Sequence, residues 1–287
     1  MGTLRGALGA LRSQKLQEGE ALIRIIVIGA PGKMGRRLVD LIQTDPELTL
    51  TGAVTHREHP ALGRDAGEVA GVGVVGVPLG SDLAALLPQA EVVIDFSVAE
   101  ATLAYLRLTA AAQKAMVIGT TGFTGAQRDD IARLSQGMRC FLAPNMSVGV
   151  NVLFQLLRRA AVLLPNYDVE IIEAHHRTKV DAPSGTALRL GTIVAEQRGQ
   201  TLDDVAIYGR QGIVGRRADP EIGIQAIRAG DIVGEHTVIF GGLGERLELI
   251  HRTQNRDTFA HGALRAAKWI VQQPPGLYSM EDLLQLT

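Results

Sequence analysis

Several features that mark whole classes of protein are missing from this sequence. One cysteine, Cys140, stands among 287 residues, so no internal disulfide can form, which is typical of a reducing compartment and predicts a cytoplasmic protein. Lysine plus arginine (29) and aspartate plus glutamate (30) nearly cancel, which leaves no charge excess to attract nucleic acid or an anionic membrane. No apolar run approaches the ~20 residues that span a bilayer. The chain is therefore predicted to bind neither nucleic acid nor membranes.

The first twenty residues lack the continuous apolar segment of a secretory signal. Residues 1–20 are predicted to form a disordered or weakly helical extension. A transit peptide is the alternative, although Glu18 and Glu20 are unusual in such a peptide.

What the sequence does contain is a regular alternation of strand-like and helix-like segments. Hydrophobic residues make up 46% of the chain, enough to bury a substantial core. Apolar, strand-like runs lie at residues 22–28, 48–55, 91–97, 115–119 and 140–143, with helix-compatible stretches among them. Near-continuous hydrophobic strands that alternate with helices indicate an α/β fold with a parallel sheet covered on both faces.

The pattern changes after Asn145. A helix-like stretch at residues 150–164 is followed by strand-like segments at 169–174, 222–228, 235–240 and 246–251, and glycine-containing turns precede the last two. We expect these segments to be antiparallel strands in a mixed or antiparallel sheet of a second, α+β domain. A final helix is predicted at residues 258–271.

A glycine-rich loop follows the first predicted strand and opens the first predicted helix. Residues 29–35 read Gly-Ala-Pro-Gly-Lys-Met-Gly, at the position that a dinucleotide fingerprint requires. Glycines let the backbone approach a pyrophosphate, and a helix N-terminus supplies N–H donors. The spacing is G-x-x-G-x-x-G rather than G-x-G-x-x-G, so a plain tight turn is the alternative. Residues 119–122 and 143–146 follow later strands, and open α/β sheets bind ligands at such strand ends. Ordinary turns are the alternative for each of these two segments.

The segment 173–187 carries more reactive side chains than any other. It reads Glu-Ala-His-His-Arg-Thr-Lys-Val-Asp-Ala-Pro-Ser-Gly-Thr-Ala and joins a strand to a helix. Residues 184–186 (Ser-Gly-Thr) would start that helix with backbone N–H groups and two hydroxyls, which suits a carboxylate or phosphate. Lys179 adds a cation, and His175 and His176 can titrate near neutrality. Together these residues suit an anionic substrate that takes up a proton.

Plainer interpretations of this segment stay open. The histidines could be surface residues at a strand end, and residues 184–186 could be only a helix cap. A metal site of His175, His176 and Asp181 is disfavoured, because adjacent residues on a strand point to opposite faces. No metal is therefore predicted.

The segment 173–187 resembles the signature of the 4-hydroxy-tetrahydrodipicolinate reductase family, also called dihydrodipicolinate reductases. Residues 117–123 (Val-Ile-Gly-Thr-Thr-Gly-Phe), 145–151 (Asn-Met-Ser-Val-Gly-Val-Asn) and 228–237 (Arg-Ala-Gly-Asp-Ile-Val-Gly-Glu-His-Thr) resemble further blocks of that family, in the same order. The resemblance covers residue 22 to about residue 280.

The resemblance implies a Rossmann-like, doubly wound dinucleotide-binding domain of residues 21–146 and 255–287. It also implies a substrate-binding and oligomerisation domain of residues 147–254, which builds a homotetramer. In the implied reaction, a nicotinamide cofactor, NADPH or NADH, reduces 4-hydroxy-tetrahydrodipicolinate to tetrahydrodipicolinate with loss of water. This step belongs to lysine (diaminopimelate) biosynthesis, and its substrate is a small dicarboxylate.

The resemblance also implies roles for single residues. His175 matches the family's proton donor and acceptor, and Lys179 matches its proton donor. The residues that match substrate contacts are His176, Lys179, Ser184, Gly185 and Thr186. The residues that match cofactor contacts are Gly29, Ala30, Pro31, Gly32, Lys33, Met34, Gly119, Thr120, Thr121, Ala143, Pro144, Asn145 and Met146.

One pair of residues departs from the family's pattern. Many bacterial members carry an acidic residue followed by arginine after the second strand, whereas this chain has His56 and Arg57. A carboxylate there binds the adenosine ribose and repels a 2′-phosphate, but Arg57 offers a phosphate a planar donor fork, and Lys33 can add a second cation. We therefore predict that NADPH is preferred and that NADH is still usable. Two other interpretations compete with this one. Glu58, two residues after His56, would restore the acidic group, or His56 and Arg57 form a solvated loop end without cofactor preference.

Two rival functions share part of this evidence. Another two-domain dehydrogenase would have the glycine loop but would not need paired histidines leading into Ser-Gly-Thr. A regulator that binds NAD(P) without catalysis should lack a proton donor beside an anion site.

Overall fold

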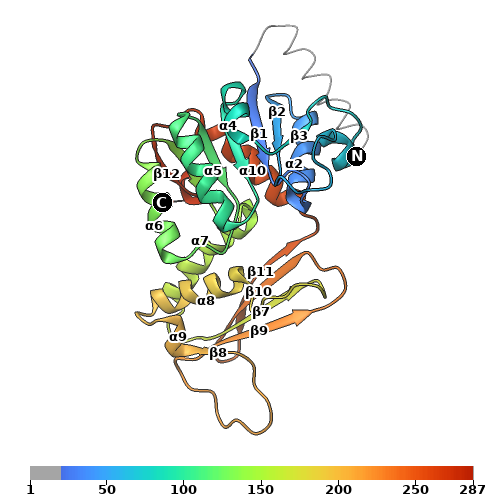
Figure 1. Cartoon of the computed structure of the whole chain (residues 1–287). Helices are drawn as coiled ribbons and strands as arrows, with labels where there is room; N and C mark the ends of the chain where they lie inside the picture. The colour runs from blue at the N-terminus through green and yellow to red at the C-terminus, as the bar shows by residue number, and fades with distance from the viewer. Residues whose placement is uncertain (1–20, 287) are drawn as a thin grey trace. The chain divides into compact units, whose positions relative to one another are not determined.

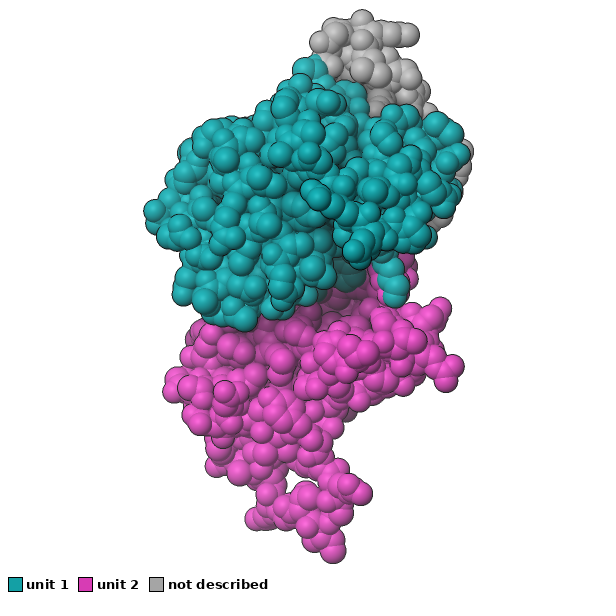
Figure 2. Space-filling view, viewed as in Figure 1, with its two compact units in different colours: residues 1–146, 257–285, 287 teal, residues 147–256, 286 magenta. Residues whose placement is uncertain are grey.

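The computed structural model describes residues 21–286, which fall into two compact units (Figure 1, Figure 2). The first unit runs to Met146 and includes Asp257–Gln285, and the second is Ser147–Arg256. The predicted extension of residues 1–20 lies outside the described residues. Among the helices of residues 21–286, none combines the length and the apolar content of a membrane span.

The first unit is built on a seven-stranded sheet in which neighbouring strands run parallel. The strand order is β12-β6-β5-β4-β1-β2-β3. The strands are β1 (Ile23–Ile28), β2 (Leu48–Val54), β3 (Leu79–Gly80), β4 (Val92–Asp95), β5 (Ala115–Ile118), β6 (Arg139–Leu142) and β12 (Gly276–Tyr278). The helices are α2 (Lys33–Thr44), α3 (Ala66–Ala70), α4 (Leu83–Leu86), η1 (Leu87–Gln89), α5 (Ala99–Ala111), α6 (Gly125–Ser135), α10 (Asp257–Ile270) and α11 (Met280–Leu284).

The central strands of this sheet are buried on both faces. Ile25, Val93 and Val117, from three adjacent strands, have no exposed surface, as expected of parallel strands between layers of helices. The predicted Rossmann-like parallel sheet is therefore confirmed. The strand order reverses between β1 and β4, and open α/β sheets bind ligands at the carboxyl ends of the strands beside such a point.

Helix α10 brings the end of the chain back to the first unit. It packs against α2, β5 and β6. At its start, Asp257 binds the guanidinium of Arg37 on α2, with 2.6 Å between Oδ1 and Nε. Near its end, Lys268 binds Asp45, just after α2, at 2.8 Å. Two ion pairs therefore join α10 to the helix that begins at the glycine-rich loop.

The second unit is a five-stranded sheet with its helices on one face (Figure 1). The strand order is β11-β10-β7-β9-β8. The strands are β7 (Asp168–His175), β8 (Ala206–Ile207), β9 (Ile222–Arg228), β10 (Gly234–Gly241) and β11 (Arg246–Thr253). The helices are α7 (Val148–Leu163), α8 (Gly185–Gln197) and α9 (Leu202–Val205). The core between helices and sheet includes Leu157, Leu190, Val238 and Phe240.

The prediction that these strands are antiparallel is wrong for one long pairing. Strand β10 is antiparallel to β7 and β11, but β7 and β9 run parallel, so the sheet is mixed. The reason is the connection between β7 and β9, which contains α8 and α9. Parallel strands need such a long crossover, whereas a tight turn joins antiparallel ones.

Candidate active site

The loop from β1 to α2 packs closely at the carboxyl edge of the first sheet. Gly29 has a φ of +72°, a conformation that favours glycine, and a Cβ there would lie 2.7 Å from the carbonyl oxygen of Phe96. A Cβ on Gly35 would lie 2.2 Å from the carbonyl oxygen of Gly29. Gly32 caps α2 with no side-chain hydrogen bond, so the backbone N–H groups of the first turn face outward from the helix start. This is the geometry of a pyrophosphate-binding turn.

The ends of β4 and β5 meet at the same edge. The N–H of Gly119 donates to the carbonyl oxygen of Asp95 at 2.9 Å, and the N–H of Ser97 donates to Thr120 Oγ1 at 3.1 Å. A Cβ on Gly119 would lie 2.3 Å from the ring of Phe96. Phe96, which the sequence analysis does not single out, therefore contacts two of the predicted cofactor segments.

The other predicted cofactor residues also follow strands of this sheet. The N–H of Ala143 donates to the carbonyl oxygen of Ile118 at 3.1 Å, which holds the end of β6 beside β5. His56 and Arg57 follow β2, and both are exposed. Within the remaining loops, the buried residues are Ala30, Pro31 and Met146, the half-buried ones are Met34 and Asn145, and the exposed ones are Lys33, Thr121 and Pro144.

A buried carboxyl group lies beneath this edge. Asp95 at the end of β4 has no exposed surface. Its Oδ2 lies 2.6 Å from Thr102 Oγ1, and its Oδ1 accepts the N–H of Ser97 at 2.9 Å. Burial raises the pKa of Asp95, against the effect of these hydrogen bonds. The edge therefore combines backbone donors, spaces that a Cβ would fill and a carboxyl group held toward its neutral form, and this combination fits an anionic dinucleotide.

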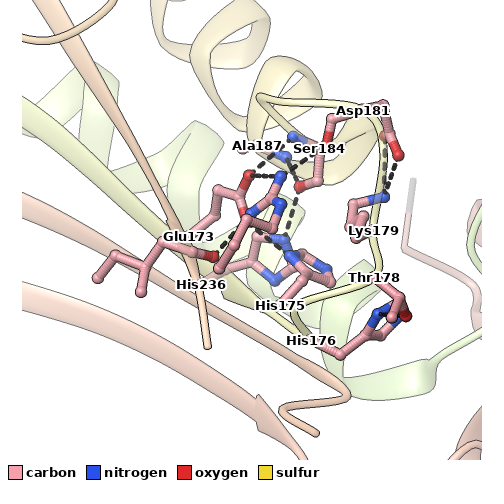
Figure 3. Close-up of polar contacts among 11 residues, drawn as sticks. Glu173, His175, His176, Thr178, Lys179, Asp181, Ser184, Ala187 and His236 are labelled. Carbon is pink, nitrogen blue, oxygen red and sulfur yellow. Dashed lines mark hydrogen bonds and ion pairs between the residues drawn. The ribbon is translucent and has the colours of Figure 1, made fainter. Parts of the chain in front are cut away.

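In the second unit, Glu173 on β7 is the centre of a polar cluster (Figure 3). Its side chain is fully buried. Oε2 lies 2.5 Å from His175 Nδ1 and 2.9 Å from Arg228 Nη1, while Oε1 lies 2.8 Å from Arg228 Nη2 and accepts the N–H of Ser184 at 3.0 Å. Burial opposes the negative charge, but the hydrogen bonds from Arg228 and His175 outweigh it and lower the pKa of Glu173.

The two adjacent histidines have different partners. His175 Nδ1 faces Glu173, whereas His176 Nδ1 lies 2.9 Å from Thr178 Oγ1 in the following loop. Figure 3 shows the two rings apart, as expected at the end of a strand where successive side chains point to opposite faces. Residues 21–286 contain no group of three or more His, Cys, Asp or Glu side chains that could hold a metal ion.

Lys179 lies in the loop between β7 and α8, paired with a carboxylate. Its Nζ donates to both oxygens of Asp181, at 2.7 and 2.8 Å. The hydrogen bond from Lys179 lowers the pKa of Asp181. The backbone carbonyl of Asp181 accepts from Arg228 Nη2 at 2.6 Å, so Arg228 ties this loop to Glu173. Lys179 keeps 21% of its side chain exposed, and a bound anion can compete with Asp181 for its ammonium.

Ser184 caps α8, as the sequence predicts. Its Oγ accepts the N–H of Ala187 at 3.2 Å and lies 3.1 Å from Nε2 of His236, a buried residue of β10. Burial, with the charge of His175 adding to it, lowers the pKa of His236 to about 4, so this imidazole is neutral at neutral pH. Gly185 is exposed, and a Cβ on it would meet nothing within 4 Å. The start of α8 is therefore open to a ligand.

The structure thus brings His175, Lys179 and residues 184–186 into one loop-and-helix segment. It adds three residues that the sequence analysis gives no role, namely Glu173, Arg228 and His236. All three lie within segments that resemble the family, and a charged residue inside an apolar strand is a signal that could have identified Glu173. The contacts of Arg228 and His236 depend on strand pairing, which the sequence does not show.

Comparison with known proteins places the whole described chain in one family. The model "Dihydrodipicolinate reductase, N-terminus" matches residues 23–146, and "Dihydrodipicolinate reductase, C-terminus" matches residues 149–284. The chain is 53% identical over 264 residues to the 4-hydroxy-tetrahydrodipicolinate reductase of Syntrophus aciditrophicus, covering 92% of this chain and 98% of the relative. It is 51% identical to that of Pelobacter propionicus, covering 92% and 100%.

A solved structure agrees. It is described as dipicolinate-bound dihydrodipicolinate reductase from Paenisporosarcina sp. TG-14, and it is similar to this chain with a TM-score of 0.73 and 26% identity. The match covers 91% of this chain and 99% of that one. The family predicted from the motifs is confirmed, and the chain belongs to the dihydrodipicolinate reductase family.

Proposed function

We propose that this chain reduces 4-hydroxy-tetrahydrodipicolinate to tetrahydrodipicolinate with loss of water, at the expense of NADPH or NADH, in lysine biosynthesis. Its relatives carry the name of this activity over 92% of the chain. The observation that carries the proposal is the cluster in the second unit, where a histidine bound to an ionised carboxylate lies in the same segment as a lysine and an open helix N-terminus. This cluster combines proton transfer with anion binding.

The substrate's carboxylates would bind at the start of α8. The backbone N–H groups of Gly185 and Thr186 and the hydroxyls of Ser184 and Thr186 would donate. The helix dipole favours negative charge, and Lys179 and His176 add polar contacts. The similar structure from Paenisporosarcina sp. TG-14 is described as dipicolinate-bound, which shows that a dicarboxylate binds that relative.

The reaction consumes one hydride and one proton, so the site must hold a proton donor. We assign this role to His175, with Lys179 as the second donor. His175 donates from Nδ1 to Glu173, which leaves Nε2 to exchange a proton with the substrate. Lys179 can leave Asp181 for the substrate, because both partners are partly exposed.

The cofactor supplies the hydride when it is bound. The first unit would hold it through residues 29–34, 119–121 and 143–146, where Phe96 packs against Gly29 and Gly119. We also propose that NADPH is preferred, since Arg57 and Lys33 are exposed cations and no carboxylate occupies position 56.

The second unit would also build a homotetramer. Its helices cover one face of the sheet, and the other face carries Ile227 and Ile250, exposed by 46% and 45%. An apolar sheet face without a helical layer can be covered by a second copy of the same face. Light scattering at several protein concentrations tests this assembly, and a monomer at every concentration would contradict it.

NADPH oxidation, followed by near-ultraviolet absorbance, tests the proposed reaction. The substrate is formed in place from pyruvate and aspartate semialdehyde, and the control omits one of these two. Oxidation that depends on both is expected. A dehydrogenase with another substrate would show no such dependence, and a regulator would bind NADPH without turning it over.

A further inference from the structure

Glu173 is a fully buried carboxylate that neither transfers a proton nor binds substrate in the proposed reaction, although it accepts from His175. It lies on the helix-covered face of β7, two residues after Ile171, which is also fully buried. A buried charge costs free energy unless it is paired and hydrogen-bonded. A hydrophobic side chain would fill this position at lower cost, so the charge calls for a specific explanation.

The contacts of Glu173 reach the histidine, the helix start and the arginine of the cluster. Each carboxylate oxygen receives two hydrogen bonds: Oε1 from the Ser184 N–H and Arg228, and Oε2 from His175 Nδ1 and Arg228. In Figure 3 the carboxylate lies between the ring of His175 and the turn that starts α8. One side chain therefore contacts both the residue assigned to proton transfer and the N–H of Ser184, the residue that caps the anion-binding helix start.

The charge on Glu173 decides which ring nitrogen of His175 carries a proton. The hydrogen bonds from Arg228 and His175 overcome burial and lower the pKa of Glu173, so it is ionised at neutral pH. An ionised carboxylate can only accept hydrogen bonds, so Nδ1 of His175 must carry a proton. Nε2 is then the nitrogen that gains and loses a proton. Beside Nε2 lies Gly234, where a Cβ would come within 3.1 Å of this nitrogen.

We propose that Glu173 is a positioning residue that fixes Nε2 as the reactive nitrogen of His175 and holds the anion-binding turn at Ser184 in register with it. The proposal rests on the proposed function, since it assumes that His175 exchanges a proton with a substrate bound at the start of α8.

Glu173→Gln separates this role from simple space filling. The amide keeps the size of the side chain, but it has one acceptor and one donor group where the carboxylate has two acceptors. If the amide oxygen stays with Ser184, the NH₂ group faces His175 Nδ1, which must then accept, and the imidazole proton moves to Nε2. If the amide is turned, the NH₂ group faces the Ser184 N–H and opens that turn.

The test combines kinetics with ¹⁵N NMR of histidine-labelled full-length protein. The nitrogen shifts show which ring nitrogen is protonated, at about pH 8 where the neutral form dominates for an ordinary histidine. The His175 signal is identified by its loss in His175→Gln. We expect a proton on Nδ1 in the wild type and on Nε2 in Glu173→Gln, or a weakened affinity for pyridine-2,6-dicarboxylate if the turn opens. We expect kcat to fall by about 10²–10⁴-fold with NADPH affinity unchanged.

The same strand offers a matched control in Glu170. This glutamate also pairs with two arginines, Arg210 at 2.9 Å and Arg217 at 3.4 Å, but it does not contact the cluster. Glu170→Gln should leave kcat and the His175 tautomer as in the wild type. Glu173→Asp keeps the charge on a shorter side chain, and it should retain the Nδ1 proton and recover part of the lost kcat.

The outcomes separate this proposal from the proposed function. A wild-type His175 with its proton on Nε2 would overturn the proposal, even if Glu173→Gln failed to fold. A Glu173→Gln enzyme with wild-type kcat would also overturn it, as would equal losses in Glu170→Gln. A wild type that does not oxidise NADPH with the substrate would instead refute the proposed function. The NMR experiment would still show which nitrogen of His175 is protonated, because it does not depend on activity.

Discussion

Each unit of the molecule buries one carboxyl group at its ligand edge, and the pKa values of the two groups are shifted in opposite directions. Asp95 in the first unit lies beside uncharged groups, the hydroxyl of Thr102 and the N–H of Ser97, and burial raises its pKa. Glu173 in the second unit contacts Arg228 and His175, whose hydrogen bonds outweigh burial and lower its pKa. Neither side chain has exposed surface, but only Glu173 has charged partners, and the pKa shifts of the two groups have opposite directions.

The difference matches what each edge is proposed to bind. An anionic dinucleotide is best met by backbone dipoles and a neutral carboxyl group, since a second negative charge would repel its phosphates. Proton transfer needs ionised partners that hold a histidine in one orientation. The first edge is thus built from glycines and strand ends, and the second from charged side chains.

The largest expected effect comes from removing the proton donors of the second unit. His175→Gln and Lys179→Ala should each lower kcat by about 10²–10⁴-fold, the usual contribution of a positioned general acid. NADPH affinity should stay near the wild-type value, because neither residue belongs to the first unit. Kinetics with saturating substrate and NADPH titration check both parts.

A histidine in the first unit provides the control. His261 is exposed on α10, and His261→Gln should leave kcat unchanged. If both donor variants kept most of the wild-type kcat, the second edge would bind substrate without transferring protons, and the contrast between the two units would disappear.

Many of the residues that form the two ligand edges can be located from the sequence. The strands of the first unit are continuous apolar runs, and the glycine loop and the segment 173–187 are continuous in the chain, so local patterns suffice to find them. The direction of β9 relative to β7 is not local. It depends on the α8 crossover, and the strand pattern alone is the same for either direction.

The residues that complete the second edge are also distant in sequence. Arg228 lies 55 residues from Glu173, and His236 lies 52 residues from Ser184. Each meets its partner because β9 and β10 flank β7 in a particular register. Phe96 follows a predicted strand directly, but its contact with Gly119 requires β4 and β5 to be neighbours.

The second unit should also lose stability in mild acid because of His236. Burial lowers its pKa to about 4 from the ordinary 6.5, so between these values the unfolded chain binds a proton that the folded chain does not. Stability therefore falls as the pH drops below 6.5, by about 2 kcal/mol at pH 5 relative to neutral pH. The His236→Gln variant has no imidazole at this position, so it should lose less stability between neutral pH and pH 5. Urea unfolding of both proteins at the two pH values measures the difference, and equal losses would mean that His236 is charged in the folded state.

In the first unit, a single methyl group at the edge should weaken cofactor binding. Gly119→Ala would place a Cβ 2.3 Å from the Phe96 ring, which must move. Overpacking of this kind costs about 1–2 kcal/mol, or roughly 5–30-fold in NADPH affinity. Gly125→Ala is the matched control, because its Cβ meets nothing within 4 Å. Calorimetry should show weaker NADPH binding only for Gly119→Ala, with dicarboxylate binding unchanged in both; unaltered NADPH affinity would exclude Gly119 from the cofactor site.

Cofactor choice should depend on an exposed charge rather than on a buried one. We expect the wild type to favour NADPH, and Arg57→Ala to raise the KM for NADPH by about 3–10-fold while that for NADH changes little. The effect should shrink as salt screens the phosphate contact. Arg64→Ala removes another exposed arginine of the same unit and should change neither value. A wild type that favours NADH, or an Arg57→Ala enzyme with unaltered NADPH kinetics, would remove the basis for this assignment.

The smallest effect is expected at Asp95, and it sharpens the comparison of the two carboxyl groups. If Asp95 is protonated at Oδ2, it donates to Thr102 Oγ1 at 2.6 Å, and the threonine proton then goes to the carbonyl oxygen of Val98 at 3.1 Å. Asparagine reproduces this pattern, with its NH₂ group toward Thr102 and its oxygen toward the Ser97 N–H.

Asp95→Asn should therefore keep the free energy of unfolding at pH 7 within about 0.5 kcal/mol of the wild type, or increase it. The sign follows from linkage. The pKa of Asp95 is raised in the folded state, so above pH 3.8 the unfolded chain releases a proton that the folded chain retains, and the wild type loses stability as the pH rises toward the folded pKa. The asparagine variant has no such loss. A variant destabilised by several kcal/mol would show that Asp95 is ionised, and the two edges would then not differ in the charge of their buried carboxyl groups.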